Sequence, residues 1–370
     1  MRIGIIGGGQ LGRMLALAGY PLGYRFTVVD PNEGSPAGQL AQQITAGYDD
    51  ASALLHLAET CDVVTYEFEN VPVESARLIQ QHCPIYPTPQ ALEVSQDRLA
   101  EKRFAAEIGI PTPRFEPVGS KDEIAQAIKK VGLPAILKTR RFGYDGKGQL
   151  ALNSTQDMDA LPEEIFQAPG GLILEKMIRF DRELSLLGVR SISGEMAFYP
   201  LVENHHRDGI LRISFAPAKM VSRKLHEKAV LYGRSILSRM DYVGVLALEL
   251  FQAGDDFLFN EMAPRVHNSG HWTIEGSVTS QFENHIRAIS GMPLGDISCQ
   301  GDSVMFNLVG CPPDGHSVLA VEGAHLHLYG KEARLERKIG HITLNPVTHS
   351  ACSKLRSMIE ADQGIFLPEA

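Results

Sequence analysis

The sequence is poor in cysteine and lacks long apolar runs, and both shortages narrow the possible classes of protein. Only five of its 370 residues are cysteine. They are scattered and form no C-x-x-C pair, which argues against a disulfide framework or a cysteine-based zinc site. No apolar stretch reaches the ~18–20 residues that a membrane span requires, and the first residues follow a strand pattern rather than a signal peptide. We therefore expect reduced thiols and a cytoplasmic protein with no membrane partner.

Basic residues are also in the minority. The chain has 35 Lys and Arg against 44 Asp and Glu, which gives a formal net charge of −9. Such a balance disfavours binding to nucleic acid or to an anionic membrane, although a local basic cluster can still bind phosphate. The length exceeds the ~250–300 residues at which a single core stops growing, so more than one domain is expected.

The pattern of apolar residues changes twice along the chain. Residues 1–96 alternate short strands and helices, which predicts a parallel α/β sheet. Residues 97–291 combine strands, a glycine-rich loop and a long helix over 222–240, which is typical of an α+β domain. Residues 292–370 hold three strand patterns and a final helix and are too few for more than a small satellite. The predicted fold class is therefore α/β followed by α+β.

The chain begins with a glycine fingerprint of the form G-x-G-x-x-G between Gly7 and Gly12. An apolar strand pattern over 3–6 precedes it, and apolar residues at helical spacing over 11–18 follow it. Glycines in such a turn let an anion approach the helix N-terminus. Asp30 ends a second strand pattern about where a ribose-binding acid would fall. NAD is one possible ligand of this turn, and simple packing of the turn is the alternative.

A second glycine-rich segment follows an apolar strand pattern that ends in Lys138. Its loop contains Gly143, Gly146 and Gly148 and leads into another strand pattern. Because Gly148 follows Lys147 where Ser or Thr would ligate magnesium, this is not a P-loop. The arrangement is typical of a flap whose backbone N–H groups cover phosphates, with the lysine as a charged partner. A surface hairpin with a solvated lysine is the alternative.

Two glutamates occupy a predicted β-hairpin. Strand patterns over 243–251 and 257–260 flank a turn at 254–256. If the pairing is centred on the middle residue of this turn, Glu249 and Glu261 lie opposite each other, with Cβ atoms ~4.5–5.5 Å apart, where like charges repel. Magnesium between them would convert this repulsion into affinity. The alternatives are that one glutamate pairs with an Arg or Lys, or that the register slips by one residue.

Several uncommon segments, taken together, resemble those of one family. They are GGGQLGRM, TYEFENV, QDRLAEK, FGYDGKGQ, NEMAPRVHNSGHWT and YGKEARLERKIGHI. They span nearly the whole chain and resemble the 5-(carboxyamino)imidazole ribonucleotide synthases, which are ATP-grasp enzymes. The resemblance implies a Rossmann-like pre-ATP-grasp domain over 1–96, an ATP-grasp domain over 97–291 and a small C-terminal domain over 292–370 that completes the substrate site. It also implies that the opening glycine turn serves a ribonucleotide and not NAD.

The resemblance implies a ligase reaction of purine synthesis. ATP would phosphorylate bicarbonate to carboxyphosphate, and the amine of 5-aminoimidazole ribonucleotide would then be carboxylated, with ADP and phosphate as the other products. The implied cofactors are ATP and Mg²⁺, and the family suggests a homodimer.

Residue roles are carried over position by position from the same resemblance. The implied ATP contacts are Arg98, Lys138, Gly143, Tyr144, Asp145, Gly146, Lys147, Gly148, Gln149, Glu175, Lys176, Met177, Ile178, Glu183, His206, Asn260 and Glu261. Residues 175–178 would hold adenine through backbone groups. The implied metal ligands are Glu249 and Glu261. The implied substrate contacts are Gln10, Leu11, Glu67, Tyr144, His267, Asn268, Ser269, Lys331, Arg337 and Lys338, and the implied catalytic residues are Asp145 and Arg265.

One motif departs from the family pattern. Leu335 and Glu336 stand where the family usually has Pro-Gly before the basic pair Arg337 and Lys338. An added carboxylate that points inward would weaken a phosphate site, which leaves the choice of basic contacts open.

Three alternative functions follow from parts of the sequence. A formate-using glycinamide ribonucleotide transformylase would share the ATP-grasp architecture and the basic pair, but the segments QLGRM and HNSGHWT look more like the carboxylating enzyme. An NAD-dependent oxidoreductase or a non-catalytic nucleotide-binding module would need neither the opposed glutamates nor the flap.

Overall fold

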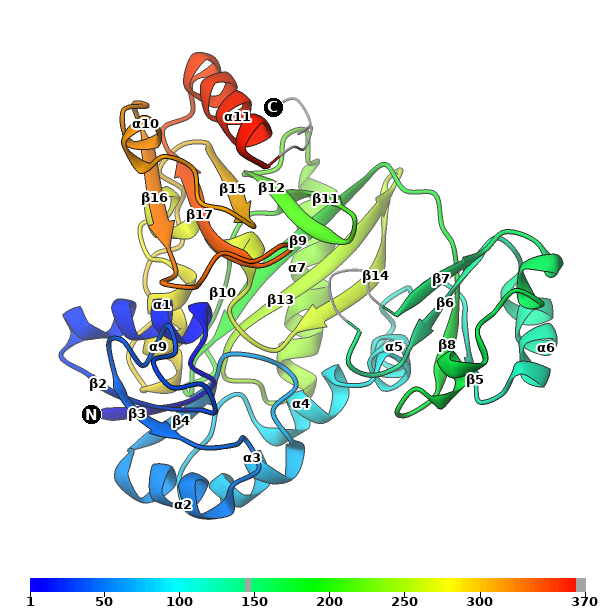
Figure 1. Ribbon diagram of the computed structural model, residues 1–370, viewed down its shortest axis with the longest axis horizontal. Helices are drawn as coiled ribbons and strands as arrows, with labels where there is room; N and C mark the ends of the chain where they lie inside the picture. Colours follow the sequence, from blue (N-terminus) through cyan, green and yellow to red (C-terminus); the bar gives the residue numbers. More distant parts are fainter. Residues whose placement is uncertain (144–147, 364–370) are drawn as a thin grey trace.

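The computed structural model describes residues 1–143 and 148–363. Three β-sheets organise this part of the chain, with four, nine and four strands (Figure 1). The nine-stranded sheet lies in the middle. The amino-terminal sheet packs below it in the view of Figure 1, and the second four-stranded sheet forms a lobe at its side.

The amino-terminal sheet is parallel, as the alternation of strands and helices predicts. Its strands are, in spatial order, β3 (Gln42–Thr45), β2 (Arg25–Asp30), β1 (Arg2–Ile6) and β4 (Val63–Tyr66). Its helices are α1 (Gln10–Gly19), α2 (Ala51–Thr60), α3 (Val73–Gln80) and α4 (Pro89–Ser95), with a 3₁₀ turn η1 (Tyr20–Leu22). The strands are apolar on both faces because α1 packs on one face while α2 and α3 pack on the other.

The lobe at the side is a small antiparallel sheet covered by one helix. Its strands are, in spatial order, β5 (Phe115–Val118), β8 (Leu172–Lys176), β6 (Ala135–Thr139) and β7 (Gln149–Leu152). The same part of the chain contains helix α6 (Lys121–Val131) and the 3₁₀ turns η2 (Thr155–Met158) and η3 (Glu163–Gln167). Helix α6 buries Ile124, Ile128 and Val131, which recur at helical spacing, against this sheet. Its first turn is acidic and its last turn is basic, which suits the helix dipole.

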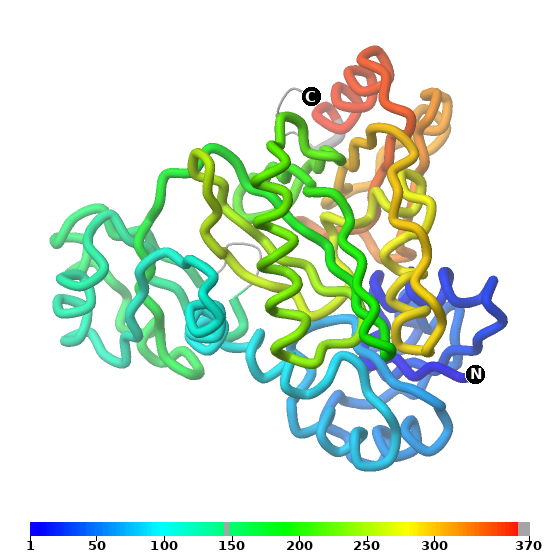
Figure 2. Tube along the Cα trace, turned by 180° about the vertical axis from the view of Figure 1, so that it is seen from behind, coloured from blue at the N-terminus to red at the C-terminus, as the bar shows by residue number. Residues whose placement is uncertain are grey.

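The central sheet carries most of the remaining chain. Its strands are, in spatial order, β14 (Asp256–Ala263), β13 (Gly244–Ala253), β9 (Arg182–Arg190), β11 (Val202–Arg207), β12 (Ile210–Ala216), β15 (Ser303–Val309), β17 (Lys338–Leu344) and β16 (Ala324–Leu328), with β10 (Met196–Phe198) beside β9. Helices α5 (Arg98–Glu107) and α7 (Arg223–Arg239) pack on one face, and α9 (Gln281–Ile289) packs on the other. Figure 2 shows α7 lying across the rear face.

The last part of the chain continues the central sheet. Strand β15 pairs with β12, and β17 and β16 follow, so the sheet runs across the boundary predicted at residue 291. The short helices η4 (Asn268–Gly270) and α8 (Thr273–Gly276) come before this part, and α10 (Gly315–Leu319) lies within it. Helix α11 (His349–Gln363) covers the sheet beside the core cluster around Phe306. The exact domain boundaries stay a prediction.

Two local predictions are wrong. The sequence pattern over 84–86 predicts a strand, but this segment makes only a single bridge, between Val64 and Ile85, because it begins with one proline and is followed by another. The proline-containing segment 110–118 is expected to be a linker, but it contains β5, which pairs with β8. Across the described ranges, no helix combines the length and the apolar character needed to cross a bilayer.

Candidate active site

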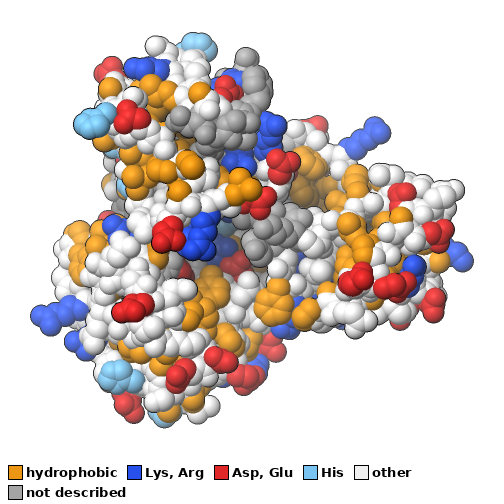
Figure 3. Space-filling view, in the orientation of Figure 1, with side chains coloured by type: hydrophobic (Ala, Val, Ile, Leu, Met, Phe, Trp, Pro, Cys, Tyr) orange, Lys and Arg blue, Asp and Glu red, His pale blue; other side chains and the backbone are white. Residues whose placement is uncertain are grey.

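A cavity of about 650 Å³ lies where the three sheets meet. Figure 3 shows this hollow between the lobes, with both acidic and basic side chains around it. Each part of the described chain contributes to its walls. Of the residues that the sequence singles out, the walls contain Gln10, Leu11, Glu67, Arg98, Lys138, Gly143, Gln149, Glu183, His206, Glu249, Asn260, Glu261, Arg265, His267, Asn268 and Lys338.

The remaining predicted residues fall into two groups. The described walls of the cavity do not include Gly148, Glu175, Lys176, Met177, Ile178, Ser269, Lys331 or Arg337. Tyr144, Asp145, Gly146 and Lys147 lie outside the described residues. The predicted flap and the predicted catalytic aspartate therefore stay predictions.

The two glutamates of the β13–β14 hairpin lie opposite each other, as predicted. Glu249 pairs with Glu261, but the next pair is Leu250 with Phe259, so Asn260 is an extra residue in a β-bulge. The expected three-residue turn is wrong, because Ala253 already pairs with Asp256 across a two-residue turn. Without the bulge, this tighter turn would place Asn260 opposite the first glutamate. The bulge restores the opposition of the carboxylates.

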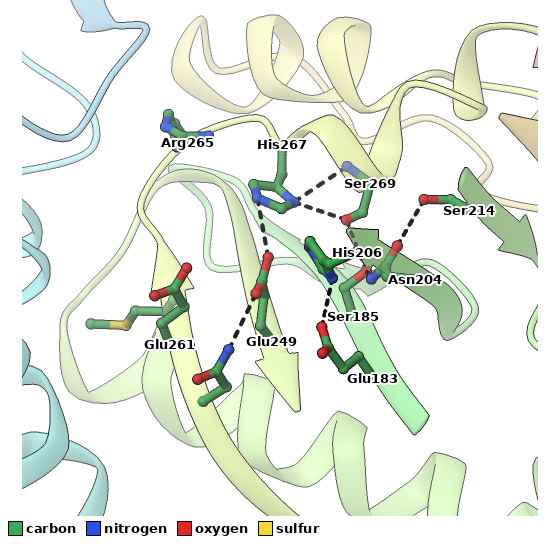
Figure 4. A network of polar contacts seen from close by, with 12 residues as sticks. Glu183, Ser185, Asn204, His206, Ser214, Glu249, Glu261, Arg265, His267 and Ser269 are labelled. Atoms are coloured by element: carbon green, nitrogen blue, oxygen red, sulfur yellow. Dashed lines mark hydrogen bonds and ion pairs between the residues drawn. The ribbon is translucent and has the colours of Figure 1, made fainter. Parts of the chain in front are cut away.

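The electrostatic environments of these two carboxylates differ (Figure 4). Burial and the negative charge of Glu261 raise the pKa of Glu249 to about 7. Burial acts in the same direction on Glu261, but Arg98, at 2.8 Å, holds the pKa of Glu261 below its usual range. Glu249 lies 3.4 Å from Nε2 of His267. The predicted alternative in which one glutamate pairs with an arginine is thus realised alongside the opposed pair.

This pair of carboxylates fits a magnesium ion that takes its other ligands from phosphates and water. Magnesium in nucleotide sites is usually held by one or two carboxylates rather than by an all-protein cage. Among the described residues, no group of three or more His, Cys, Asp and Glu side chains could hold a metal ion. Cross-strand repulsion between Glu249 and Glu261, expressed in the raised pKa of Glu249, is what a cation would relieve.

The cationic side of the cavity comes from α5 and β6. Arg98 is in the first turn of α5, and Lys138 lies near the end of β6. The Lys138 ammonium donates to Oε2 of Glu175 at 3.0 Å, and Lys102 lies 3.5 Å from the same oxygen. Although burial opposes it, these two lysines hold the pKa of Glu175 at about 2. The side chain of Glu175 therefore neutralises lysines within the protein.

The adenine hinge over 175–178 stays a prediction, and the fold uses two of its backbone donors. Backbone N–H groups of Lys176 and Met177 donate to the carbonyls of Arg114 and Pro134 at 2.8 and 3.1 Å. Those two donors are used by the fold because β8 and the segments beside it must satisfy their own backbone groups. Sequence reasoning also missed an aromatic pair in the cavity wall. The rings of Phe180 and Phe251 stack there with their centroids 4.6 Å apart. Such a pair offers an apolar face to a flat base.

A histidine and a glutamate line the next part of the wall. Nδ1 of His206 lies 2.6 Å from Oε2 of Glu183, and Figure 4 shows both side chains beside Glu249. Burial alone would lower the pKa of His206, but Glu183 and Glu249 raise it. The neighbouring carboxylates therefore favour the protonated imidazole more than water does.

The loop after β14 supplies Arg265 and His267. Arg265 donates to Glu69 at 2.5 Å, and this contact holds the pKa of Glu69 at about 2 although burial opposes it. The sequence analysis missed Glu69, although it is the second acidic residue of the segment TYEFENV. Burial lowers the pKa of His267 well below its usual range. Its Nδ1 lies 2.9 Å from Oγ of Ser269, and this serine is fully buried, so it orients the histidine rather than facing the cavity.

The amino-terminal glycine turn is closed by the protein's own carboxylates. Glu67 accepts hydrogen bonds from the N–H groups of Gly9 and Gly12, the latter at 2.8 Å. Asp30 accepts from the N–H of Gly8 at 2.8 Å and from the Tyr48 hydroxyl at 2.9 Å. The donors and the acid that a dinucleotide would need are therefore already paired. The Glu67 side chain is buried, and burial raises the pKa of its carboxyl group.

The late basic residues lie at different distances from the cavity. Lys331 donates to the side chain of Gln10, and burial lowers the pKa of Lys331 to about 8. Arg337 donates to the backbone carbonyl of Glu332 at 3.3 Å, outside the cavity wall. Lys338 lies in the wall itself. Of these three residues, Lys338 lines the cavity, and Lys331 contacts Gln10, which also lines it.

A cavity between a small antiparallel sheet and a large one, with cations on one side and paired carboxylates on the other, defines the ATP-grasp class. The family model of the ATP-grasp domain matches residues 103–282. The ribonucleotide synthetase preATP-grasp domain matches residues 1–96, and the phosphoribosylaminoimidazole carboxylase C-terminal domain matches residues 303–354.

Whole-chain comparisons define the family more narrowly. An N5-carboxyaminoimidazole ribonucleotide synthase from Pseudomonas aeruginosa is 46% identical over 361 residues, which cover 98% of this chain and 99% of the relative. The crystal structure of the synthetase from Thermus thermophilus is 52% identical, with a TM-score of 0.92 over 96% of this chain and 98% of that one. The chain belongs to the N5-carboxyaminoimidazole ribonucleotide synthase family.

Several solved relatives carry nucleotides, and one of these also carries a ribonucleotide. The Aspergillus clavatus enzyme, in complex with ADP and 5-aminoimidazole ribonucleotide, is 33% identical, with a TM-score of 0.89 over 98% of this chain and 99% of that one.

Proposed function

We propose that this protein carboxylates 5-aminoimidazole ribonucleotide in an ATP-dependent step of purine synthesis, with bicarbonate as the carbon source. The products are N5-carboxyaminoimidazole ribonucleotide, ADP and phosphate. The observation that carries the proposal is the opposition of Glu249 and Glu261 in the wall of a cavity that Arg98 and Lys138 also line. The family membership and the ligands of the Aspergillus clavatus relative support the choice of ATP and ribonucleotide.

Two bond changes account for the chemistry. A bicarbonate oxygen attacks the γ-phosphorus of ATP and ADP leaves, which gives carboxyphosphate. The amine nitrogen of the ribonucleotide then bonds to the carboxyl carbon, directly or after release of carbon dioxide. The carbon–oxygen bond to phosphate breaks, and the amine loses one proton. Positioning and charge neutralisation supply most of the catalysis in such phosphoryl transfers.

The residues divide between the two halves of the reaction. Arg98 and Lys138 bind phosphate oxygens, and Glu249 and Glu261 hold Mg²⁺, which when bound offsets charge on the transferred phosphoryl group. Arg265, whose charge is fixed by Glu69, and the neutral His267 face the bicarbonate and its carboxyl product.

Three further assignments complete the proposal. Gln10, Leu11, Glu67 and Lys338 face the ribonucleotide from the cavity wall. The roles of Tyr144 and Asp145 in the flap remain part of the same proposal. We also expect a homodimer, which sedimentation of the purified protein tests.

A labelling experiment tests the reaction. The protein is incubated with ATP, Mg²⁺, labelled bicarbonate and 5-aminoimidazole ribonucleotide, and acid-labile label is measured on the nucleotide. We expect label and ADP in equal amounts, and neither without the ribonucleotide. Turnover with formate and glycinamide ribonucleotide instead would identify a transformylase. Micromolar NAD affinity by calorimetry, without affinity for the aminoimidazole, would identify a dinucleotide enzyme.

A further inference from the structure

Strand β14, which carries Glu261, is the edge strand of the central sheet. On its inner side it pairs with β13, and the bulge at Asn260 interrupts that pairing. An edge strand also has outward-facing N–H and C=O groups that need partners from outside the sheet. Helix α5 lies against this strand, so its side chains can supply such partners.

Two adjacent residues of α5 hold the backbone on both sides of Glu261. The Lys102 ammonium donates to the carbonyl of Asn260 at 2.7 Å and to the carbonyl of Phe259 at 3.2 Å. Oε1 of Glu101 accepts the N–H of Met262 at 2.7 Å. The residues just before and just after the metal-binding glutamate are therefore fixed by side chains from one turn of one helix.

The burial of these two side chains shows how specific the arrangement is. Lys102 is 1% exposed and Glu101 is 2% exposed. Burying an ammonium or a carboxyl group costs free energy unless the group is hydrogen-bonded. Well-packed apolar residues at the same positions often stabilise a fold as much as a buried ion pair does, or more. Lys102 also lies 3.5 Å from Glu175, which offsets its charge. Two buried ionisable groups at the bulge therefore point to a requirement beyond stability.

We propose that Glu101 and Lys102 are positioning residues that hold the β14 bulge so that Glu261 faces Glu249 and the metal ion of the nucleotide. This inference rests on the proposed function, because it assigns the hairpin to the nucleotide's magnesium. Neither residue touches the substrate in this role. Both act through the backbone of Asn260 and Met262, which sets the direction of the intervening carboxylate.

A matched set of variants tests the proposal. Glu101→Leu removes the acceptor of the Met262 N–H, whereas Glu101→Gln keeps a side-chain oxygen in the same place. Lys102→Met removes the donor but keeps most of the side-chain volume. Arg103→Met, on the exposed side of the same helix, is the control for a change of charge in α5.

The main readout is equilibrium binding of ADP with and without Mg²⁺, measured by calorimetry without ribonucleotide or turnover. We expect Glu101→Leu and Lys102→Met to weaken the magnesium-dependent part of ADP affinity at least 10-fold. Binding of metal-free ADP should change less than 3-fold. Glu101→Gln and Arg103→Met should stay within 3-fold of the unmodified protein in both conditions.

The other outcomes are equally definite. Equal weakening of ADP with and without magnesium, or no weakening in folded protein, overturns the positioning role. Failure of both Glu101→Leu and Lys102→Met to fold also counts against it, because the pair would then belong to the structural core. If the unmodified protein itself shows no magnesium-dependent ADP affinity, the failure lies with the proposed metal site and not with α5.

Discussion

The amino-terminal glycine turn and the β13–β14 hairpin both hold glutamates, which are buried in the turn and partly exposed in the hairpin, and the two regions treat the charge in opposite ways. In the turn, Glu67 accepts two N–H groups at the start of α1, so the helix terminus that favours anions already holds one. In the hairpin, Glu249 faces Glu261, and only the latter has a close arginine. The turn is internally complete, whereas the hairpin gains from a cation.

This difference explains why the better-known motif is the poorer guide to function. A glycine fingerprint indicates that an anion can approach the backbone. In this protein that anion is the carboxylate of Glu67, which directly follows β4. The glycines are needed for that packing, because a Cβ atom at Gly9 would lie 2.4 Å from Oε1 of Glu67. The hairpin has no named motif, yet its unrelieved repulsion indicates a ligand.

The largest expected effect comes from the hairpin. Glu261→Gln should lower ATP turnover at least ~100-fold and Glu249→Gln somewhat less, because each removes a charged oxygen from magnesium. The free energy of unfolding should fall by less than about 1 kcal/mol, since the amide keeps the shape and the relief of like-charge repulsion offsets the loss of the partly exposed Arg98 ion pair. Turnover measured across magnesium concentrations, with denaturant unfolding as control, checks this. Unaltered turnover at limiting magnesium would remove the hairpin from the metal site.

The corresponding change in the turn should act on stability. Gly9→Ala should lower the free energy of unfolding by about 2 kcal/mol, because the added methyl group displaces the Glu67 carboxylate from its N–H donors. Gly119→Ala is the control, since its Cβ would meet only ordinary contacts at 3.4 Å or more. Denaturant unfolding of both variants provides the measurement. Equal stability of the two would contradict the self-closed turn.

A basic residue beside the turn should affect one substrate only. Lys331→Ala should raise the KM for the ribonucleotide about 10-fold, while the KM for ATP stays within about 2-fold, because Lys331 contacts Gln10, which we assign to the ribonucleotide and not to ATP. Arg337→Ala should have a smaller effect, since its guanidinium donates to Glu332. Steady-state kinetics with each substrate varied decides the matter. Parallel loss of both affinities would remove Lys331 from the ribonucleotide side.

The smallest effect concerns the salt bridge between Glu69 and Arg265. In the folded protein the pKa of Glu69 is about 2, below the ordinary value of a glutamate. The contact therefore stabilises the fold above pH ~4.5, and this stabilisation is lost as the pH falls towards 2. Glu69→Gln should therefore reduce the free energy of unfolding by about 1 kcal/mol at pH 7, after allowance for partial exposure. Denaturant unfolding from pH 7 to 3 should show this difference shrinking. A constant difference would mean that the charge of Glu69 contributes nothing.

Most elements of the fold could be predicted because they depend on local patterns. The sequence pattern predicts a strand over 63–66, a helix over 121–131 and a strand over 303–309, because each has a clear apolar period and clear ends. The structure has these three elements with the same bounds. The predictions for the segment 84–86 and for the stretch containing β5 were wrong. Pairing partners, and not local preference, decide whether a short proline-containing segment is a strand.

The candidate site shows the same division between what local sequence patterns predict and what contacts in space decide. The sequence by itself determined the residue types and their order: glycines at both loops, the two glutamates of one hairpin and the cluster of basic residues near the end. Only the tertiary structure decided which of these groups meet. It placed Glu67 on the glycine turn, put a bulge at Asn260 so that Glu249 faces Glu261, and brought Glu69 to Arg265. The physical reason is that charge and hydrogen bonding act through distance in space, which a linear spacing of residues does not contain.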